Sequence, residues 1–129
     1  MDWIDLPCIF NHTKTLETTF RKSSISFARS WKENKVIDQG STALYVSGNK
    51  APVKVVLPIE SVSDLLPDLI PFTMANKETV LINPNNVNSY RGFVDAGSPV
   101  EKWILYLAPV CGEDSFFIVT TPVTELFNR

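Results

Sequence analysis

The chain has 129 residues, of which 44% are hydrophobic and 20% charged, and its formal net charge is −2. This composition excludes a disordered chain, and a domain of this length buries enough surface to fold without a metal or a disulfide framework. The small negative charge excludes a protein that holds nucleic acid through its overall charge alone.

The first residues and the cysteines indicate where the protein works. Met1-Asp2-Trp3 has neither the basic start nor the apolar run of a signal peptide, and no stretch approaches the roughly 18 apolar residues of a membrane span. Cys8 and Cys111 lie far apart without framework spacing, which is typical of two reduced thiols. We therefore expect a cytoplasmic protein that does not engage a membrane.

Residues 1–23 form an N-terminal arm. Pro7 prevents a continuous helix across residues 1–11, so we expect an edge strand or a docked arm there. Within residues 13–22, Leu16 and Phe20 have the i, i+4 spacing of a helix, whereas the four threonines favour a strand. Of the two we expect a short helix.

Residues 24–67 form the first of two structural units. Apolar and polar residues alternate over 24–31, which predicts a half-buried strand. Apolar runs at 43–46 and 53–57 flank the dipeptide Gly48-Asn49. A turn dipeptide between two apolar runs is a strong signal for a β-hairpin.

The first unit ends in a predicted short helix over residues 61–66. Ser61 is the expected N-cap, with Asp64 at the capping-box position, and Pro67 ends the helix. Pro71, a second proline soon after Pro67, predicts a crossover at 68–77 without regular structure.

Residues 78–129 form the second unit. The predicted elements are strands at 78–83, 87–93, 102–108 and 115–121, turns at 84–86 and 112–114, and a closing helix at 121–126.

An internal echo links the two units, because residues 44–66 align with residues 105–127 without a gap. The matched pairs are Leu44 with Leu105, Tyr45 with Tyr106, Val62 with Val123 and Leu65 with Leu126. This predicts a duplication, since one hairpin with one short helix cannot bury its apolar face alone. The expected shared core contains Val55, Leu57, Phe116 and Ile118, with Leu65 and Leu126 packing from the helices. We predict a mainly β (α+β) single domain of two similar β-hairpin-plus-short-helix units.

A series of features between the two units is more specific. They are Leu65-Leu66-Pro67, a crossover with Phe72, then Lys77, Thr79 and Leu81-Ile82-Asn83, and later Val119 at the end of a closing hairpin. This order resembles the LytTR-type DNA-binding domain over roughly residues 25–127. The resemblance implies a transcriptional regulator whose contact residues are Lys50, Lys54, Lys77, Asn83 and Arg91.

The basic positions of that family are largely absent from this chain. Where the family has Arg and His before its Ser, and Ser-Arg-Arg after its last strand, residues 73–77 and 120–122 keep only Lys77 as a basic group. Arginine and lysine supply both phosphate neutralisation and base readout. A related β module that does not bind DNA is therefore the competing interpretation.

The chain carries no catalytic signature. Cys8, His12 and Cys111 do not close a structural zinc tetrahedron, and no paired cysteine or histidine motif supports one. All five glycines sit at turns rather than in a phosphate-binding loop. We expect no metal, no cofactor and no enzymatic activity.

The sequence therefore predicts a non-enzymatic binding module, an inhibitor or accessory protein of bacterial or phage origin that acts on a protein partner. The expected interaction surface contains Trp31, Tyr90, Phe116 and Phe117. A homodimer is a further option. The alternative is the LytTR-like regulator described above, with DNA as the partner.

Overall fold

The computed structural model describes residues 2–10 and 14–126, and the chain is mainly β, which confirms the predicted fold class. The strands are β1 (Trp3–Phe10), β2 (Lys14–Arg21), β3 (Ile25–Glu33), β4 (Val36–Val46), β5 (Val53–Val55), β6 (Ile70–Thr73), β7 (Thr79–Ile82), β8 (Val87–Val94), β9 (Glu101–Val110) and β10 (Glu113–Val119). The helices are α1 (Ile59–Leu65) and the 3₁₀ turns η1 (Lys22–Ser24), η2 (Pro84–Asn86) and η3 (Val123–Leu126).

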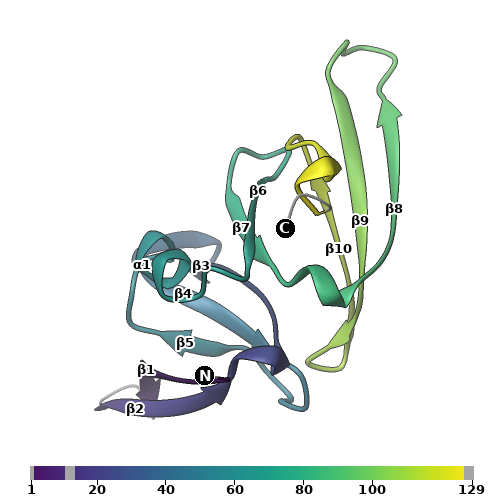
Figure 1. Cartoon of the computed structure of the whole chain (residues 1–129). Helices are drawn as coiled ribbons and strands as arrows, with labels where there is room; N and C mark the ends of the chain where they lie inside the picture. Colours follow the sequence, from purple (N-terminus) through teal and green to yellow (C-terminus); the bar gives the residue numbers. More distant parts are fainter. Residues whose placement is uncertain (1, 11–13, 127–129) are drawn as a thin grey trace.

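The strands form two antiparallel sheets (Figure 1). The large sheet has seven strands in the order β2-β1-β5-β4-β3-β7-β6, and the small sheet has three in the order β10-β9-β8. Helix α1 covers one face of the large sheet over β3 and β4, while β8 and β9 extend beyond the rest of the molecule.

Strands β3 and β7 are buried on both faces. Their register pairs Phe27 with Ile82 on one face and Ala28 with Leu81 on the other. All four side chains are at most 3% exposed. Because successive side chains of a strand point to opposite faces, this strand pair separates two apolar cores.

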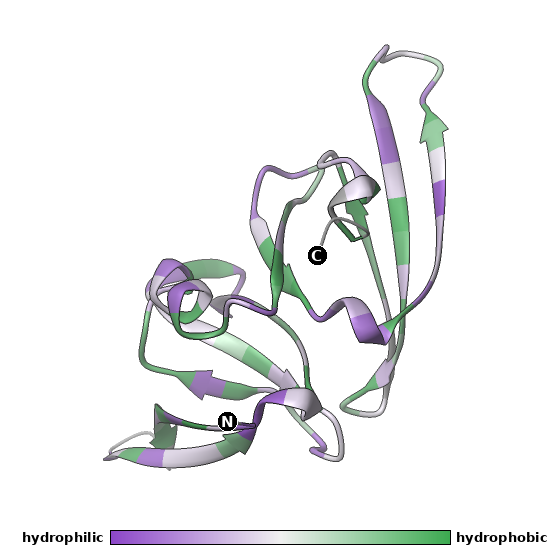
Figure 2. Cartoon of the chain, in the orientation of Figure 1, coloured by the Kyte–Doolittle hydropathy of each residue, from purple (hydrophilic) through white to green (hydrophobic). Residues whose placement is uncertain are grey.

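The two cores have different walls. The first core, under α1, contains Leu6, Cys8, Phe20, Ile25, Ala28, Leu44, Val46, Val55, Val62, Leu66, Leu69 and Leu81. The second core, between the two sheets, contains Phe27, Ile70, Phe72, Met74, Val80, Ile82, Leu105, Leu107, Val110, Phe117, Val119 and Val123. Figure 2 shows hydrophobic segments along β7, β9 and β10, which enclose the second core.

Backbone hydrogen bonds join the small sheet to the end of β6. Ala75 N–H donates to the Ile118 carbonyl at 2.9 Å and Thr120 N–H to the Thr73 carbonyl at 2.8 Å. The Thr121 hydroxyl also accepts from Thr73 N–H at 2.8 Å. The small sheet is thus fixed to the large sheet by hydrogen bonds as well as by the second core.

The predicted helix over residues 13–22 is wrong, because residues 14–21 of this segment form strand β2. It pairs with β1 along its whole length, for example Leu6 with Thr18 and Cys8 with Leu16. The β-branched threonines suit a strand, and on one face of it Phe20 is buried in the first core while Leu16 stays 46% exposed. β1 itself is not an edge strand, since it lies between β2 and β5.

The prediction that residues 68–77 lack regular structure is also wrong. They contain β6, whose register pairs Phe72 with Val80 and Ile70 with Ile82. Pro71 is tolerated because β6 lies at the end of the large sheet, where a strand has one side without ladder hydrogen bonds. Burial of Ile70 and Phe72 stabilises the strand despite the proline.

The hairpin and helix of the first unit lie where the sequence placed them. β4 and β5 pair as predicted around Gly48, whose φ of +92° glycine adopts without strain. Helix α1 ends before Pro67, but Pro58 rather than Ser61 is its N-cap, with no side-chain cap. Leu66, and not Leu65, packs into the first core.

Both echo segments form a hairpin followed by a helical turn, but their registers differ. Leu44 pairs with Val53, whereas its counterpart Leu105 pairs with Phe117. As a result Val55 is fully buried while its counterpart Phe116 is 60% exposed. The predicted shared core of Val55 with Phe116 is therefore wrong, because the two hairpins lie in different sheets and line different cores.

The shared strand pair predicts that the two cores unfold together. We expect Val55→Ala in the first core and Val80→Ala in the second each to lower the free energy of unfolding by about 2–3 kcal/mol, since each removes two buried methyl groups. Denaturant unfolding followed by circular dichroism and by tryptophan fluorescence should give coincident single transitions. Val36→Ala, at a side chain that is 68% exposed, is the matched control and should cost less than about 1 kcal/mol. Two separate transitions would contradict the coupling.

Candidate functional site

The small sheet covers only part of one face of the large sheet. The rest of this face, beside β10, is not covered by the small sheet. Lys54, Ala43, Arg29 and Val80 form one cross-strand row over β5, β4, β3 and β7. Cross-strand partners point to the same face. Val80 lies in the second core, whereas the Lys54 side chain is 26% exposed. The face therefore passes from buried to open along this row.

Two adjoining clefts lie where this uncovered part of the large sheet meets β10, with volumes of about 320 and 170 Å³. Arg29 and Tyr45 line both of them. We call the combined feature the aromatic groove. Its walls are Phe27, Arg29, Trp31 and Lys32 of β3, Ala43 and Tyr45 of β4, Pro52, and Val110, Ser115, Phe116 and Phe117 of the small sheet.

Ring contacts fix the floor of the aromatic groove. Phe27 stacks on Tyr45 with ring centroids 4.1 Å apart and meets Phe117 edge to face at 4.8 Å. The Arg29 guanidinium lies 6.0 Å from the Phe117 centroid. Phe116 next to them stays 60% exposed. The floor is held by burial. Because Phe117 faces this floor, the Phe116 side chain points to the opposite face of the small sheet, where its ring centroid lies 6.4 Å from that of Tyr106.

Trp31 stands at the other end of the groove. Its indole N–H donates to the Glu33 carboxylate at 2.6 Å, and Lys54 Nζ lies 5.5 Å from the ring centroid. The same ammonium is 3.5 Å from the Asp38 carboxylate. These contacts restrict the indole, so little side-chain entropy remains to be lost when a ligand packs against it.

The cations around the groove are already paired. Glu78 accepts from Lys32 at 3.0 Å and lies 3.6 Å from the Arg29 guanidinium. Burial raises the pKa of the Glu78 carboxyl, but hydrogen bonding and charge from Lys32, with Arg29 adding to them, outweigh it and hold the pKa below its usual range. The Gly40 N–H and the Lys54 charge likewise hold the pKa of Asp38 low. Arg29, Lys32 and Lys54 thus face Glu33, Asp38 and Glu78, and the groove is close to neutral.

The structure brings three of the four predicted interaction residues together, since Trp31, Phe116 and Phe117 all line the groove. Tyr90 lies elsewhere, on β8, where it borders a separate hollow with Leu126. Phe117 is only 6% exposed, so it supports the floor rather than meeting a ligand directly.

The predicted DNA-contact residues do not form one cluster. Lys50 lies in the β4–β5 connection, Lys54 beside Trp31, Lys77 in the β6–β7 turn and Arg91 on β8. Asn83 is 8% exposed: its side-chain amide donates to the Ile25 carbonyl at 2.9 Å, and its oxygen accepts from Asn85 N–H at 3.0 Å. These bonds fasten the end of β7 to β3, so the Asn83 side chain has a structural role.

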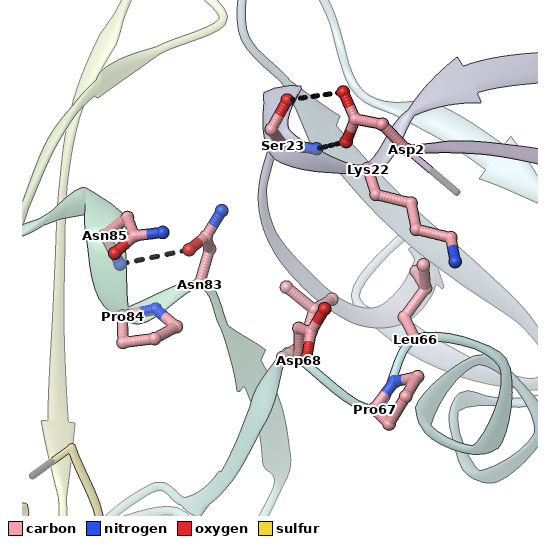
Figure 3. Close-up of a pocket in the computed structure, with 10 residues that line it drawn as sticks. Asp2, Lys22, Ser23, Leu66, Pro67, Asp68, Asn83, Pro84 and Asn85 are labelled. Carbon is pink, nitrogen blue, oxygen red and sulfur yellow. Dashed lines mark hydrogen bonds between the residues drawn. The ribbon is translucent and has the colours of Figure 1, made fainter. Parts of the chain in front are cut away.

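A second cleft, of about 360 Å³, lies beside Asn83 (Figure 3). Lys22, Leu66, Pro67 and Asp68 stand across from Asn83, Pro84 and Asn85. Two pairs of its polar residues bond to each other, Asp2 with Ser23 and Asn83 with Asn85. None of the described residues that line this cleft is aromatic, whereas aromatic rings line the groove, and we favour the aromatic groove as the candidate site.

Sequence reasoning did not select Phe27 and Tyr45. Alternation along β3 puts Phe27, Arg29 and Trp31 on one face, which is a signal visible in the sequence. What the alternation does not show is that β10 borders only part of this face. The position of Tyr45 in the internal echo likewise points to packing, and not to a site.

The structure also locates the cysteines and bears on metals and membranes. Cys8 lies in the first core and Cys111 packs against the second, so no disulfide joins them. Burial raises the pKa of the Cys8 thiol. Over residues 2–10 and 14–126 no group of three or more His, Cys, Asp or Glu side chains could hold a metal ion, and His12 lies outside the described residues. None of the helices in that part of the chain is long and apolar enough to cross a membrane.

Comparisons with family models, curated proteins and solved structures find no match for this chain. The resemblance to the LytTR-type domain and the internal duplication therefore stay predictions.

The ion pairs of Glu78 with Lys32 and Arg29, which we call the Glu78 cluster, predict a pH-dependent contribution to stability. A carboxyl whose pKa is lower in the folded than in the unfolded state stabilises the protein above its unfolded pKa of about 4.3, and this is lost as the pH falls through the folded pKa. We expect Glu78→Gln to lower the free energy of unfolding at pH 7 by about 1 kcal/mol and to flatten its dependence below about pH 4.5. Denaturant unfolding between pH 3 and pH 7 measures both effects. Glu101→Gln, at an exposed carboxylate on β9, is the control. An equal effect of the two variants would contradict the role of the cluster.

Proposed function

We propose that this protein is a non-enzymatic binding module that holds an extended, proline-containing segment of a partner protein in the aromatic groove. The observation that carries the proposal is the meeting of Trp31 and Tyr45 with the buried Phe27 and Phe117 at two adjoining clefts between the sheets. These residues come from three strands and two sheets, and ring contacts hold Tyr45 and its neighbours in place.

The chemistry of the groove favours a polyproline II segment. Aromatic side chains present flat apolar faces on which proline rings pack, and a polyproline II helix is already extended before it binds. A preformed ligand loses little conformational entropy, which matters for a shallow site. Trp31 lines one cleft and Tyr45 lines both, and these two rings provide successive ridges for such a ligand.

The charges support a peptide over nucleic acid as the ligand. Phosphate binding draws its affinity from cations that release counterions, whereas Arg29, Lys32 and Lys54 already face carboxylates within 4.0 Å. An uncharged segment leaves these ion pairs intact. The LytTR-like alternative would need a surface made from Lys50, Lys77 and Arg91, which lie on three different elements.

A non-enzymatic role follows from the groove's chemistry. Among the residues that the structure describes, no histidine or cysteine lines the two clefts, and the nearby carboxylates of Glu78 and Asp38 are held in ion pairs. General acid–base and nucleophilic catalysis need a titratable or activated group aimed at open space. We also propose a cytoplasmic location, on the argument that no disulfide joins Cys8 and Cys111, as is usual in a reducing compartment.

Fluorescence anisotropy with a labelled decaproline peptide tests the proposal. We expect binding to the wild-type chain and at least a tenfold weaker affinity for Trp31→Ala and for Tyr45→Ala, since a tenfold loss corresponds to about 1.4 kcal/mol and aromatic anchors exceed this. Trp3→Ala is the matched control, because Trp3 is an exposed tryptophan on β1 that packs against Arg21. Its affinity should equal that of the wild type.

Circular dichroism shows whether each variant is folded. Absence of peptide binding at millimolar concentration, or equal losses in Trp31→Ala and Trp3→Ala, would overturn the proposal. So would tight binding of a random DNA duplex at low salt that survives Trp31→Ala, because this result would assign the function to the basic residues.

A further inference from the structure

Strand β8 is an open edge of the small sheet. It is the last strand in the order β10-β9-β8, and no other strand of the described chain pairs with its outer side. It has eight residues, six of them exposed. An open edge strand of this length offers a row of backbone donors and acceptors to another chain.

The other sheet edges of this protein are protected, and β8 is not. β2, at one end of the large sheet, carries Lys14, Glu17 and Arg21. β6, at the other end, is short, contains Pro71 and is joined to β10 through the Met74–Val119 bridge. Charges, prolines and covered edges are the usual means of preventing unwanted strand pairing. β8 contains no lysine, proline or acidic residue.

The edge is held in an extended form before any partner arrives. β8 pairs with β9 from Val87 to Val94. At Gly92 the indole of the cross-strand residue Trp103 lies so close that a Cβ would approach its nitrogen to 3.2 Å. The indole covers the flexible residue, which limits the entropy that β8 loses when it is used as a template.

Arg91 defines what the edge would accept. Tyr90 shares a cross-strand row with Leu105 and Phe117, which are buried in the second core, so the alternating residue Arg91 points to the opposite, solvent-facing side. Arg91 is the one charged residue of β8 and forms no ion pair within residues 2–10 and 14–126. A guanidinium pairs best with a carboxylate, in a bidentate arrangement.

We propose that β8 is a second docking site, separate from the aromatic groove, that accepts an extended strand of a partner protein. The strand carries an aspartate or glutamate opposite Arg91 and an apolar residue opposite Phe93 on the same face. Backbone hydrogen bonds supply affinity, and the Arg91 pair sets the register. A second copy of this chain is disfavoured, because β8 against β8 provides no carboxylate for either Arg91.

Selection of a displayed random dodecapeptide library tests the site. On the wild-type protein we expect enrichment of alternating apolar sequences with a central acidic residue, and on Arg91→Glu enrichment of the same pattern with a central lysine or arginine. A synthetic peptide of the acidic consensus should bind Arg91→Glu at least tenfold more weakly, and exchange of its acid for lysine should restore the affinity. Lys14→Glu, at an exposed cation on β2, is the control and should bind like the wild type.

The outcomes separate this site from the groove. Protection of β8 amides in hydrogen exchange on peptide binding, unchanged by Trp31→Ala, supports the edge. Enrichment of proline-rich peptides alone, with loss of binding in Trp31→Ala, would overturn the edge and leave the groove intact. Failure to enrich any charge-dependent pattern, or a concentration-dependent dimer whose β8 amides become protected without peptide, would also overturn it.

Discussion

The fold depends on the burial of one strand pair on both of its faces. Phe27 and Ile82 face the second core while Ala28 and Leu81, on the same strands, face the first. Strands buried on both faces read as continuous apolar runs, and β7 does so from Val80 to Ile82. The β3–β7 ladder therefore holds α1 and β1 on one side and the small sheet on the other, and no part of the described chain has a core of its own.

The candidate site exists because the two cores share the β3–β7 strand pair. The small sheet is narrower than the large one, so it covers β7 and β3 but leaves the face of β4 and β5 open. Side chains at this boundary are part of the core at one end and open to solvent at the other. Phe117 and Phe27 are buried and support the groove, and Tyr45, which stacks on Phe27, is half-buried and lines both clefts. Because core residues form the floor of the aromatic groove, the packing that stabilises the fold also fixes the shape of the groove.

The aromatic groove and strand β8 differ in how their charges are paired. Along the groove each cation meets a carboxylate, as Lys32 meets Glu78 and Lys54 meets Asp38, so the surface recognises shape and apolar area more than charge. On β8 the single cation, Arg91, has no such counterpart among the described residues. One surface is thus suited to an uncharged segment and the other to an acidic strand. The two surfaces therefore differ in whether they present an unpaired charge, and this difference decides which partner each can select.

The sequence alone determined the β class, the hairpin around Gly48-Asn49, helix α1 and the aromatic identity of Trp31 and Phe116, because alternation, turn dipeptides and prolines act over a few residues. It misassigned β2 and β6, whose strand state comes from ladder bonds to β1 and β7 distant in the chain. The internal echo likewise set two hairpins but not their registers, and a shift in register decided that Val55 is buried and Phe116 exposed. Only the tertiary structure brought Trp31, Tyr45 and Phe117 into one groove. Which face of a strand is covered depends on where a second sheet ends, and no local pattern encodes that.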